Sequence, residues 1–333
     1  MKYRPLGKTG VTISEIGFGC GDNAALMIDG DPAVRRSVVA RAIEVGISYF
    51  DTSNNYGDGK SEANLGATLK EIGAKPFVAT KVRLFPDALD DIAAGVRQMC
   101  TESLERLQME SVDLYYLQNR VGAERKPGAG NMMQLTVEDV LGPVWETMQR
   151  LKAEGRTQFV GICTTGSEPA AARQVIEALP WDVVQGEYSI LQPTEIEKPE
   201  GFMGPDFGQT LSQAGSKGMG VVAYRALAAG ALAQRPHTPT RPSPGRGSRH
   251  WEGNLERAQS LEWLKAEGDE TLAGGAVRFA LSYPHMSSVL LGFSRAEYTD
   301  QANAYSEAGP LSQEAIARIK DLYLTDFGRK PRP

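Results

Sequence analysis

The chain has few of the patterns that mark secreted, membrane or nucleic-acid-binding proteins. Its three cysteines, Cys20, Cys100 and Cys163, are widely spaced, so neither a disulfide framework nor a zinc-ligand pattern is implied. The net charge of −5 disfavours general binding to nucleic acid, and no apolar run is long enough to span a membrane. The first residues lack the apolar core of a secretory signal. These absences predict a globular protein of the reducing cytoplasm.

What is present is a regular alternation of two patterns. Short β-rich runs alternate with amphipathic helical stretches, without a break in composition. The predicted strands are 15–19, 47–50, 77–80, 112–117, 157–162, 183–185, 221–223 and 289–291. The predicted helices are 33–46, 59–73, 87–107, 136–154, 167–178, 207–217, 271–283 and 296–306. Eight strands alternating with eight helices indicate a (β/α)₈ TIM barrel that forms a single domain over residues 1–333.

Both ends of the chain carry elements beyond the barrel. Residues 3–14 predict a β-hairpin, and residues 311–325 predict an extra C-terminal helix on the outside. The rival fold, a doubly wound nucleotide-binding sheet, requires Gly-x-Gly-x-x-Gly at the start of a helix. Residues 17–23 have the wrong glycine spacing and lead into a loop, which favours the barrel.

Two predicted loops are unusually long. Residues 119–135 follow the fourth strand and residues 233–253 follow the seventh. Loops of this length inside a compact domain are usually functional or disordered. The second loop carries four arginines among prolines. It is either a solvated mobile segment or a flap that brings cationic groups over a bound anion.

Three residues form a candidate acid–base site. Asp51, Tyr56 and Lys81 fall near the carboxyl ends of neighbouring predicted strands, where α/β barrels keep their chemistry. An ammonium facing the Tyr56 phenol favours the phenolate and lowers the pKa of the tyrosine. A carboxylate beside that ammonium holds it charged and in place. The three together predict a tyrosine that gives or takes a proton near neutral pH.

These residues and their strands resemble the aldo-keto reductases. The resemblance rests on residues 46–57 with Asp51 and Tyr56, on residues 78–81 ending in Lys81, and on residues 112–117. It runs through nearly the whole chain, and several motifs in the right order are more specific than any one. The resemblance implies a barrel that moves a hydride between a nicotinamide cofactor and a carbonyl carbon while Tyr56 handles the proton.

Gln118 stands where the family usually has a catalytic histidine. An amide can still donate a hydrogen bond to a carbonyl oxygen, but it cannot carry charge or relay a proton. We therefore expect Gln118 to alter substrate choice and pH profile rather than abolish redox chemistry. The histidines of the chain, His237, His250 and His285, come much later and are expected on loops or the surface.

The resemblance also implies a set of cofactor-binding residues. The first loop would lie near the cofactor through Gly19, Cys20 and Gly21, with Asp51 beside it. Cys163, Thr164 and Gln185 would hold the nicotinamide carboxamide. Tyr188 either stacks on the nicotinamide ring or belongs to the core. The segment along the pyrophosphate comprises Tyr224, Arg225, Ala226, Leu227, Gly230 and Leu232, where Arg225 replaces the usual serine.

The adenosine end of the cofactor is implied by the segment after the eighth strand. Gly292, Ser294 and Arg295 open a predicted helix and would bind the adenosine 2′-phosphate, which favours NADP(H) over NAD(H). Tyr298, Gln301 and Ala302 replace the family's usual adenine-contacting residues. The sequence lacks clustered histidine and carboxylate ligands, so no metal is expected.

The favoured interpretation is an NADP(H)-dependent oxidoreductase that interconverts carbonyls and alcohols. The substrate is a small molecule: a sugar, a larger ketone or a small aldehyde. One alternative is a cofactor-binding regulatory or sensor barrel with weak turnover, which the missing histidine supports. A second alternative, a barrel lyase or isomerase, would turn over without any change in nicotinamide absorbance. Oligomeric state is left open.

Overall fold

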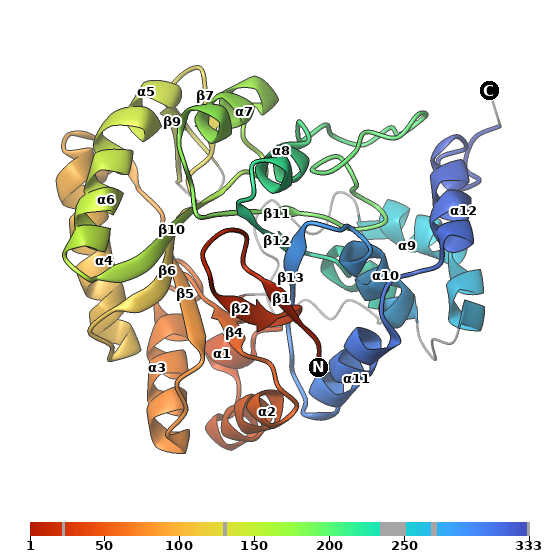
Figure 1. Ribbon diagram of the computed structural model, residues 1–333, viewed down its shortest axis with the longest axis horizontal. Helices are drawn as coiled ribbons and strands as arrows, with labels where there is room; N and C mark the ends of the chain where they lie inside the picture. Colours follow the sequence, from red (N-terminus) through yellow and green to blue (C-terminus); the bar gives the residue numbers. More distant parts are fainter. Residues whose placement is uncertain (22–23, 129–131, 234–250, 268–271, 332–333) are drawn as a thin grey trace.

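Eight parallel strands close into a barrel in a computed structural model of the chain (Figure 1). The structure describes residues 1–21, 24–128, 132–233, 251–267 and 272–331. The barrel strands are β3 (Ile16–Gly19), β4 (Tyr49–Asp51), β5 (Phe77–Val82), β6 (Val112–Leu117), β10 (Thr157–Cys163), β11 (Val183–Glu187), β12 (Gly220–Tyr224) and β13 (Met286–Leu291). The predicted TIM barrel is confirmed, and every predicted strand is present.

The barrel closes where its last strand meets its first. Val289 of β13 pairs in parallel with Ile16 of β3, and each other barrel strand pairs with the barrel strand that precedes it. The carboxyl ends of all eight strands therefore point to the same side of the barrel. Asp51 is the last residue of β4 and Lys81 is near the end of β5, so both lie at this side.

Helices surround the barrel (Figure 1). They are α1 (Leu26–Asp29), α2 (Pro32–Glu44), α3 (Lys60–Ile72), α4 (Ile92–Leu107), α5 (Val137–Asp139), α6 (Trp145–Ala153), α7 (Pro169–Ala178), α8 (Thr210–Ser216), α9 (Trp251–Gln259), α10 (Leu272–Leu281), α11 (Glu297–Ala308) and α12 (Gln313–Tyr323). Local signals set several boundaries. The Asp31 side chain caps α2 ahead of Pro32, Gly73 ends α3 in the left-handed region, and Ser312 caps the predicted C-terminal helix, α12.

The predicted helix 136–154 was wrong as one continuous element. A π-helical turn, η3 (Val140–Val144), separates α5 from α6. Pro143 lies within this turn and has no backbone N–H to donate, and Gly142 departs from helical dihedral angles. Three short 3₁₀ helices, η1 (Pro86–Leu89), η4 (Ala228–Ala233) and η5 (Glu262–Glu267), complete the helical segments that the structure describes.

The two long predicted loops have different outcomes. The segment 119–135 contains a small sheet of β7 (Val121–Gly122), β8 (Lys126–Pro127) and β9 (Met133–Thr136), in the order β7-β9-β8, which the sequence did not predict. The side chain of Asn119 holds this segment against the barrel, because it bonds the backbone of Leu84 and Met133 at 2.8 to 2.9 Å. Most of the second loop, residues 234–250, lies outside the described residues, and α9 begins at Trp251.

The predicted N-terminal hairpin covers the amino end of the barrel. It consists of β1 (Tyr3–Pro5) and β2 (Thr12–Ser14), paired antiparallel. Gly7 in its turn has φ of +56°, and a Cβ there would come within 2.2 Å of the Gly220 backbone nitrogen, so only glycine fits. Leu6 and Ile13 from the hairpin pack with the buried side chains that fill the barrel interior.

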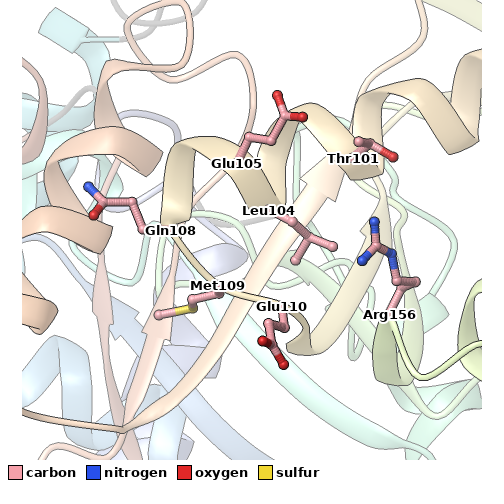
Figure 2. A pocket seen from close by; sticks show the side chains of 7 residues that line it. All are labelled: Thr101, Leu104, Glu105, Gln108, Met109, Glu110 and Arg156. Atoms are coloured by element: carbon pink, nitrogen blue, oxygen red, sulfur yellow. The ribbon is translucent and has the colours of Figure 1, made fainter.

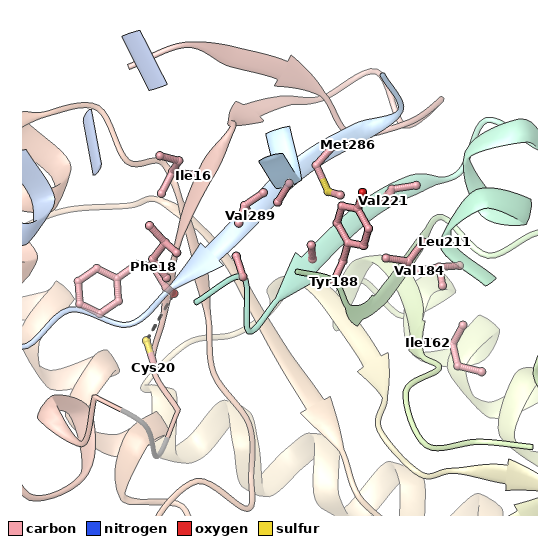
Figure 3. Packing of buried hydrophobic residues seen from close by; sticks show 14 of the residues in the cluster. Ile16, Phe18, Cys20, Ile162, Val184, Tyr188, Leu211, Val221, Met286 and Val289 are labelled. Atoms are coloured by element: carbon pink, nitrogen blue, oxygen red, sulfur yellow. Dashed lines mark hydrogen bonds between the residues drawn. The ribbon is translucent and has the colours of Figure 1, made fainter. Parts of the chain in front are cut away.

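A larger apolar cluster lies between the barrel and its helices. Figure 3 shows part of it, with Phe18, Val184, Leu211 and Val289 drawn from strands and a helix far apart in the sequence. Both faces of each barrel strand are buried. This explains why the strands are nearly continuous apolar runs and do not alternate between apolar and polar residues. Within the described residues, no helix combines the length and the apolar character that crossing a membrane requires.

A hollow of about 360 Å³ lies on the outside, away from the carboxyl ends of the strands (Figure 2). It is lined by the last turns of α4, by Met109 and Glu110 before β6, and by Arg156 before β10. The lining belongs to the amino ends of two strands, whereas ligand sites of barrels lie at the other end. The functional site is therefore expected at the carboxyl ends of the strands.

Candidate active site

A buried ion pair forms the centre of the candidate site. The Lys81 ammonium donates a short hydrogen bond to the Asp51 carboxylate and a second one, of 2.7 Å, to the carbonyl oxygen of Thr52. Both side chains are at most 3% exposed. Burial by itself lowers the pKa of Lys81, but the negative charges of Asp51 and Tyr56 outweigh burial, and the pKa lies above its ordinary value. Lys81 therefore carries its positive charge at every physiological pH.

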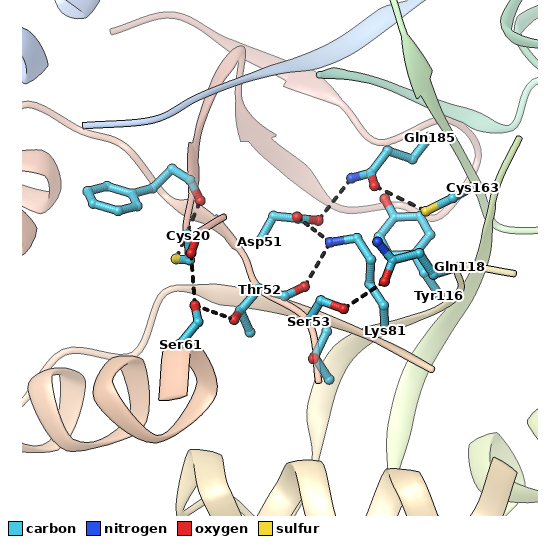
Figure 4. A network of polar contacts seen from close by, with 12 residues as sticks. Cys20, Asp51, Thr52, Ser53, Ser61, Lys81, Tyr116, Gln118, Cys163 and Gln185 are labelled. Carbon is cyan, nitrogen blue, oxygen red and sulfur yellow. Dashed lines mark hydrogen bonds and ion pairs between the residues drawn. The ribbon is translucent and has the colours of Figure 1, made fainter. Parts of the chain in front are cut away.

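Asp51 is held by further donors besides the lysine. The side-chain amide of Gln185 donates to its second oxygen at 2.9 Å (Figure 4). The Tyr49 hydroxyl donates to the same oxygen at 3.3 Å. The Cys163 thiol in turn donates to the Gln185 amide oxygen at 3.2 Å. These contacts fix the carboxylate, so the ammonium bonded to it has a defined position.

Tyr56 lies beside the ammonium, as the sequence predicts. The Lys81 nitrogen is 5.3 Å from the centroid of the Tyr56 ring. The tyrosine follows β4 in a turn in which its backbone N–H donates to the Ser53 carbonyl oxygen at 3.2 Å. Gly21 borders the ring closely, because a Cβ at Gly21 would lie 3.3 Å from the ring carbon that carries the hydroxyl. The residue at position 21 thus sets the space around the phenol.

Gln118 completes the predicted catalytic set. It directly follows β6, and its backbone N–H donates to the Val82 carbonyl oxygen at 2.9 Å. Its side chain is half-buried, and its amide oxygen accepts a hydrogen bond of 2.7 Å from the Ser53 hydroxyl. Figure 4 shows this hydrogen bond close to the Lys81 side chain. The structure therefore brings all four predicted catalytic residues to the carboxyl end of the barrel.

The histidines do not supply the missing imidazole in the part of the chain that the structure describes. His285 precedes β13 at the amino end of the barrel, with its ring centroid 5.5 Å from that of Tyr283. His237 and His250 fall outside the described residues. No cluster of three or more histidine, cysteine, aspartate or glutamate side chains suited to a metal occurs among the described residues.

The predicted carboxamide-binding residues divide into two groups. Cys163 and Gln185 face Asp51, inside the barrel. The Thr164 hydroxyl instead lies 2.9 Å from the Thr210 hydroxyl and 3.4 Å from the carboxyl group of Glu195. Glu195 is fully buried beside the ends of β10 and β11, and burial raises its pKa to about 8. Thr164 thus belongs to a second, buried polar cluster that the sequence did not reveal.

Two of the predicted cofactor residues lie in the apolar core. Tyr188 is 7% exposed, and its ring stacks on that of Phe279 in α10 with centroids 5.3 Å apart. The structure thereby places it among core residues, which was one of the two interpretations left open. Ala302 of α11 is 1% exposed and packs in the same core. Its methyl group has little surface left with which to contact an adenine ring.

The segment after β12 departs from regular geometry. Arg225, Ala228, Ala229 and Gly230 all have positive φ. Arg225 forms an ion pair with Glu187, the last residue of β11, at 3.1 Å. Tyr224 and Leu227 are half-buried, whereas Ala226 and Leu232 are buried. The arginine predicted to meet phosphate oxygens therefore already has a carboxylate partner.

Comparison with known proteins gives the chain a family. The model of the aldo/keto reductase family matches residues 15–324, which include every barrel strand and all four predicted catalytic residues. The chain belongs to the aldo/keto reductase family. This family is one of oxidoreductases, and the predicted family resemblance is confirmed.

The relatives of this aldo/keto reductase include sugar dehydrogenases. The chain is 27% identical to L-galactose dehydrogenase of Arabidopsis thaliana, over 97% of the chain and 94% of that protein. It is also 27% identical to D-threo-aldose 1-dehydrogenase of a Pseudomonas species, over 93% of the chain and 95% of that protein. The holo form of aldo-keto reductase AKR11C1 from Bacillus halodurans superposes with a TM-score of 0.73 at 24% identity, covering 97% and 96% of the two chains. This structural likeness supports the fold.

The segment predicted to bind the adenosine 2′-phosphate lies at the surface of this aldo/keto reductase. Gly292, Ser294 and Arg295 lie exposed between β13 and α11. No side chain caps the first turn of α11, and the Thr299 backbone N–H there donates to the Ala296 carbonyl oxygen. A Cβ at Gly292 would come within 2.9 Å of the Ala24 side chain, which shows how closely the first and last loops approach. Tyr298 is half-buried and Gln301 exposed in the first two turns of α11.

The first loop borders the candidate site next to Asp51. Gly19 ends β3, and the Cys20 backbone N–H donates to the Asp51 carbonyl oxygen at 2.9 Å. Burial, followed by the Asp51 charge, raises the pKa of the Cys20 thiol well above its ordinary value. Cys20 therefore stays a neutral thiol and does not act as a nucleophile.

Sequence reasoning missed two tyrosines of the site, Tyr49 and Tyr116. Their hydroxyl groups lie 3.2 Å apart inside the barrel, and Tyr49 contacts Asp51. Gly161 makes room for Tyr116, because a Cβ there would come within 2.5 Å of its ring. The signal was available: Tyr49 is two residues before Asp51 and Tyr116 is two before Gln118, so the alternation of a strand places each pair on one face.

Proposed function

We propose that this aldo/keto reductase is an NADP(H)-dependent oxidoreductase that interconverts carbonyl compounds and alcohols. One observation carries the proposal: the buried Lys81–Asp51 pair lies beside Tyr56 at the carboxyl end of the barrel. A buried ion pair can be a structural feature only. Here, however, the ammonium faces a half-buried phenol at the end of the barrel where this fold does its chemistry.

Tyr56 is the proton donor in reduction and the proton acceptor in oxidation. When bound, the nicotinamide ring supplies or accepts the hydride. The Lys81 charge favours the phenolate of Tyr56, so the phenol releases its proton to the developing alkoxide more easily than an isolated tyrosine would. Asp51 holds Lys81 charged and in position. The Gln118 amide donates a hydrogen bond to the carbonyl oxygen, which orients and polarises it.

The loop before α11 supports NADP(H) over NAD(H). Arg295 is exposed and follows Ser294 at the start of a helix whose first turn has no side-chain cap. A 2′-phosphate placed there would meet a guanidinium, a hydroxyl and the positive end of the helix dipole. NAD(H) has no such group, and the same residues would then have no charged ligand.

Aldoses are among the substrates that we propose. The support is the printed function of two relatives, L-galactose dehydrogenase and D-threo-aldose 1-dehydrogenase, each aligned over more than nine-tenths of the chain. Members of one enzyme family that share 27% identity can differ in their substrates. Larger ketones and small aldehydes therefore belong in the same screen.

The first test follows nicotinamide absorbance with NADPH and a reactive dicarbonyl. Loss of NADPH that disappears in Tyr56→Phe would support the proposal. Tyr3→Phe is the matched control, since it also removes one phenol hydroxyl but lies 52% exposed at the amino end of the barrel. Equal rates in all three proteins would refute the role of Tyr56.

A regulatory protein is the second candidate, favoured by the glutamine at position 118. Such a protein would bind NADPH tightly and turn over little, because a neutral amide relays no proton. Tight NADPH binding without turnover, in either direction, would favour this candidate. Restored turnover in Gln118→His would then identify the amide as the cause.

A further inference from the structure

Ser53 connects the candidate catalytic residues to one another. It is fully buried and follows Thr52, whose carbonyl oxygen accepts from Lys81 at 2.7 Å. Its own carbonyl oxygen accepts from the backbone N–H of Tyr56. Its hydroxyl lies 2.7 Å from the amide oxygen of Gln118 (Figure 4) and 2.7 Å from that of Asn55. Only the last two contacts depend on the serine side chain.

The single hydroxyl proton limits how this network can be arranged. A serine hydroxyl donates one hydrogen bond, so it can donate to Gln118 or to Asn55 but not to both. The other amide must then turn its NH₂ group toward the serine oxygen. If Asn55 donates to Ser53, Ser53 donates to the Gln118 oxygen. The NH₂ group of Gln118 is then directed away from Ser53 and is available to a substrate.

The opposite arrangement would remove the donor that reduction needs. If Gln118 donated its NH₂ group to Ser53, its carbonyl oxygen would face the substrate instead. A carbonyl oxygen facing a substrate carbonyl oxygen is repulsive, and no hydrogen bond forms between two acceptors. The direction of the Asn55–Ser53–Gln118 chain therefore decides whether Gln118 can polarise the substrate.

We propose that Ser53 is a positioning residue, which donates to the Gln118 amide oxygen and thereby presents the Gln118 NH₂ group to the carbonyl oxygen of the substrate. A glutamine amide can rotate by half a turn, which exchanges its NH₂ group for its oxygen. A glutamine at position 118 therefore needs a partner that fixes its orientation. Ser53 meets this need. The inference rests on the proposed carbonyl reduction.

Ser53→Ala should keep the backbone contacts and free the amide of Gln118 to rotate. We expect kcat/KM for carbonyl reduction to fall about tenfold, mainly in kcat, which is the size of effect that one well-placed hydrogen bond gives. The dissociation constant for NADPH should stay unchanged, because the altered contact faces the substrate.

A double-mutant cycle with Gln118→Ala separates positioning from general damage. If Ser53 acts only through Gln118, Ser53→Ala should have no further effect on kcat/KM once Gln118 is alanine. Ser61→Ala is the matched control. It removes another fully buried hydroxyl, which bonds Thr52 and the Cys20 carbonyl oxygen at 2.9 Å but not Gln118. Its effect should be additive with that of Gln118→Ala.

The outcomes are distinct. Coupling of about tenfold for Ser53 with Gln118, together with additivity for Ser61, supports the inference. Additive effects of Ser53→Ala and Gln118→Ala in an active parent overturn it, and leave the proposed function standing. A parent chain that reduces no carbonyl overturns the proposed function, and the role of Ser53 with it.

Discussion

Replacing Glu195 by glutamine is expected to make the folded chain less sensitive to alkaline pH. Glu195 is fully buried, and its carboxyl group accepts hydrogen bonds from the hydroxyls of Thr210 and Thr165, the latter at 2.8 Å. Burial raises its pKa from an ordinary value of 4.5 to about 8, the threonine hydroxyls oppose the rise, and the Glu187 charge adds to it. The folded chain therefore holds a proton on Glu195 that the unfolded chain has already lost at neutral pH.

The sign of the effect follows from this difference. Because the folded pKa is raised, the stabilisation is fully present below about pH 4.5 and is lost as the pH rises through about 8. Each pH unit in this window costs about 1.4 kcal/mol. Between pH 5 and pH 8 the parent should therefore lose on the order of 3 kcal/mol of unfolding free energy through this group. Glutamine has a similar shape and does not titrate, so Glu195→Gln should not show this loss.

Urea unfolding followed by tryptophan fluorescence at several pH values measures the difference. The quantity of interest is the gap in unfolding free energy between parent and variant, which should widen from pH 5 to pH 8. Glu15→Gln is the control, since Glu15 is equally buried but forms an ion pair with Arg4 at 2.6 Å. The Glu15→Gln variant should show the same decrease of unfolding free energy between pH 5 and pH 8 that Glu195 causes in the parent. Parallel pH curves for the parent and Glu195→Gln would refute the reasoning.

Three further predictions concern the site. Asp51→Asn should lower kcat at least tenfold and the unfolding free energy by about 3 kcal/mol, because it leaves the buried Lys81 charge without its carboxylate. Initial-rate measurements test the first effect and urea unfolding tests the second. Glu187→Gln should lower the dissociation constant for NADPH about tenfold, because it releases Arg225 to pair with the cofactor phosphates. An unchanged dissociation constant in a fluorescence titration would contradict this prediction. Arg295→Ala should raise that constant about tenfold for NADPH and leave it unchanged for NADH, as titration with both cofactors would show.

The barrel and the meeting of Lys81 with Asp51 at its carboxyl end were predictable because they depend on local patterns. Each barrel strand is a short apolar run bounded by a loop, and the glycine spacing in residues 17–23 favoured the barrel over a doubly wound sheet. Lys81 and Asp51 fall at strand ends in the sequence itself, so their meeting needs only the barrel topology. The small sheet in 119–135 was missed because its position depends on another segment, through the hydrogen bonds of Asn119 to the backbone of Leu84. The break in the helix 136–154 has a local cause, Gly142 and Pro143, which the search for apolar periodicity did not take into account.

The sequence by itself determined which residue types stand at the carboxyl ends of the strands. Only the tertiary structure decided which of them face one another. Tyr188 stacks in the core, Arg225 pairs with Glu187, and Glu195 is buried among threonines, although each could equally have faced the open end. The Ser53–Gln118 contact spans 65 residues. The physical reason is that a side chain's rotamer and partner depend on packing from distant segments, which no local pattern encodes.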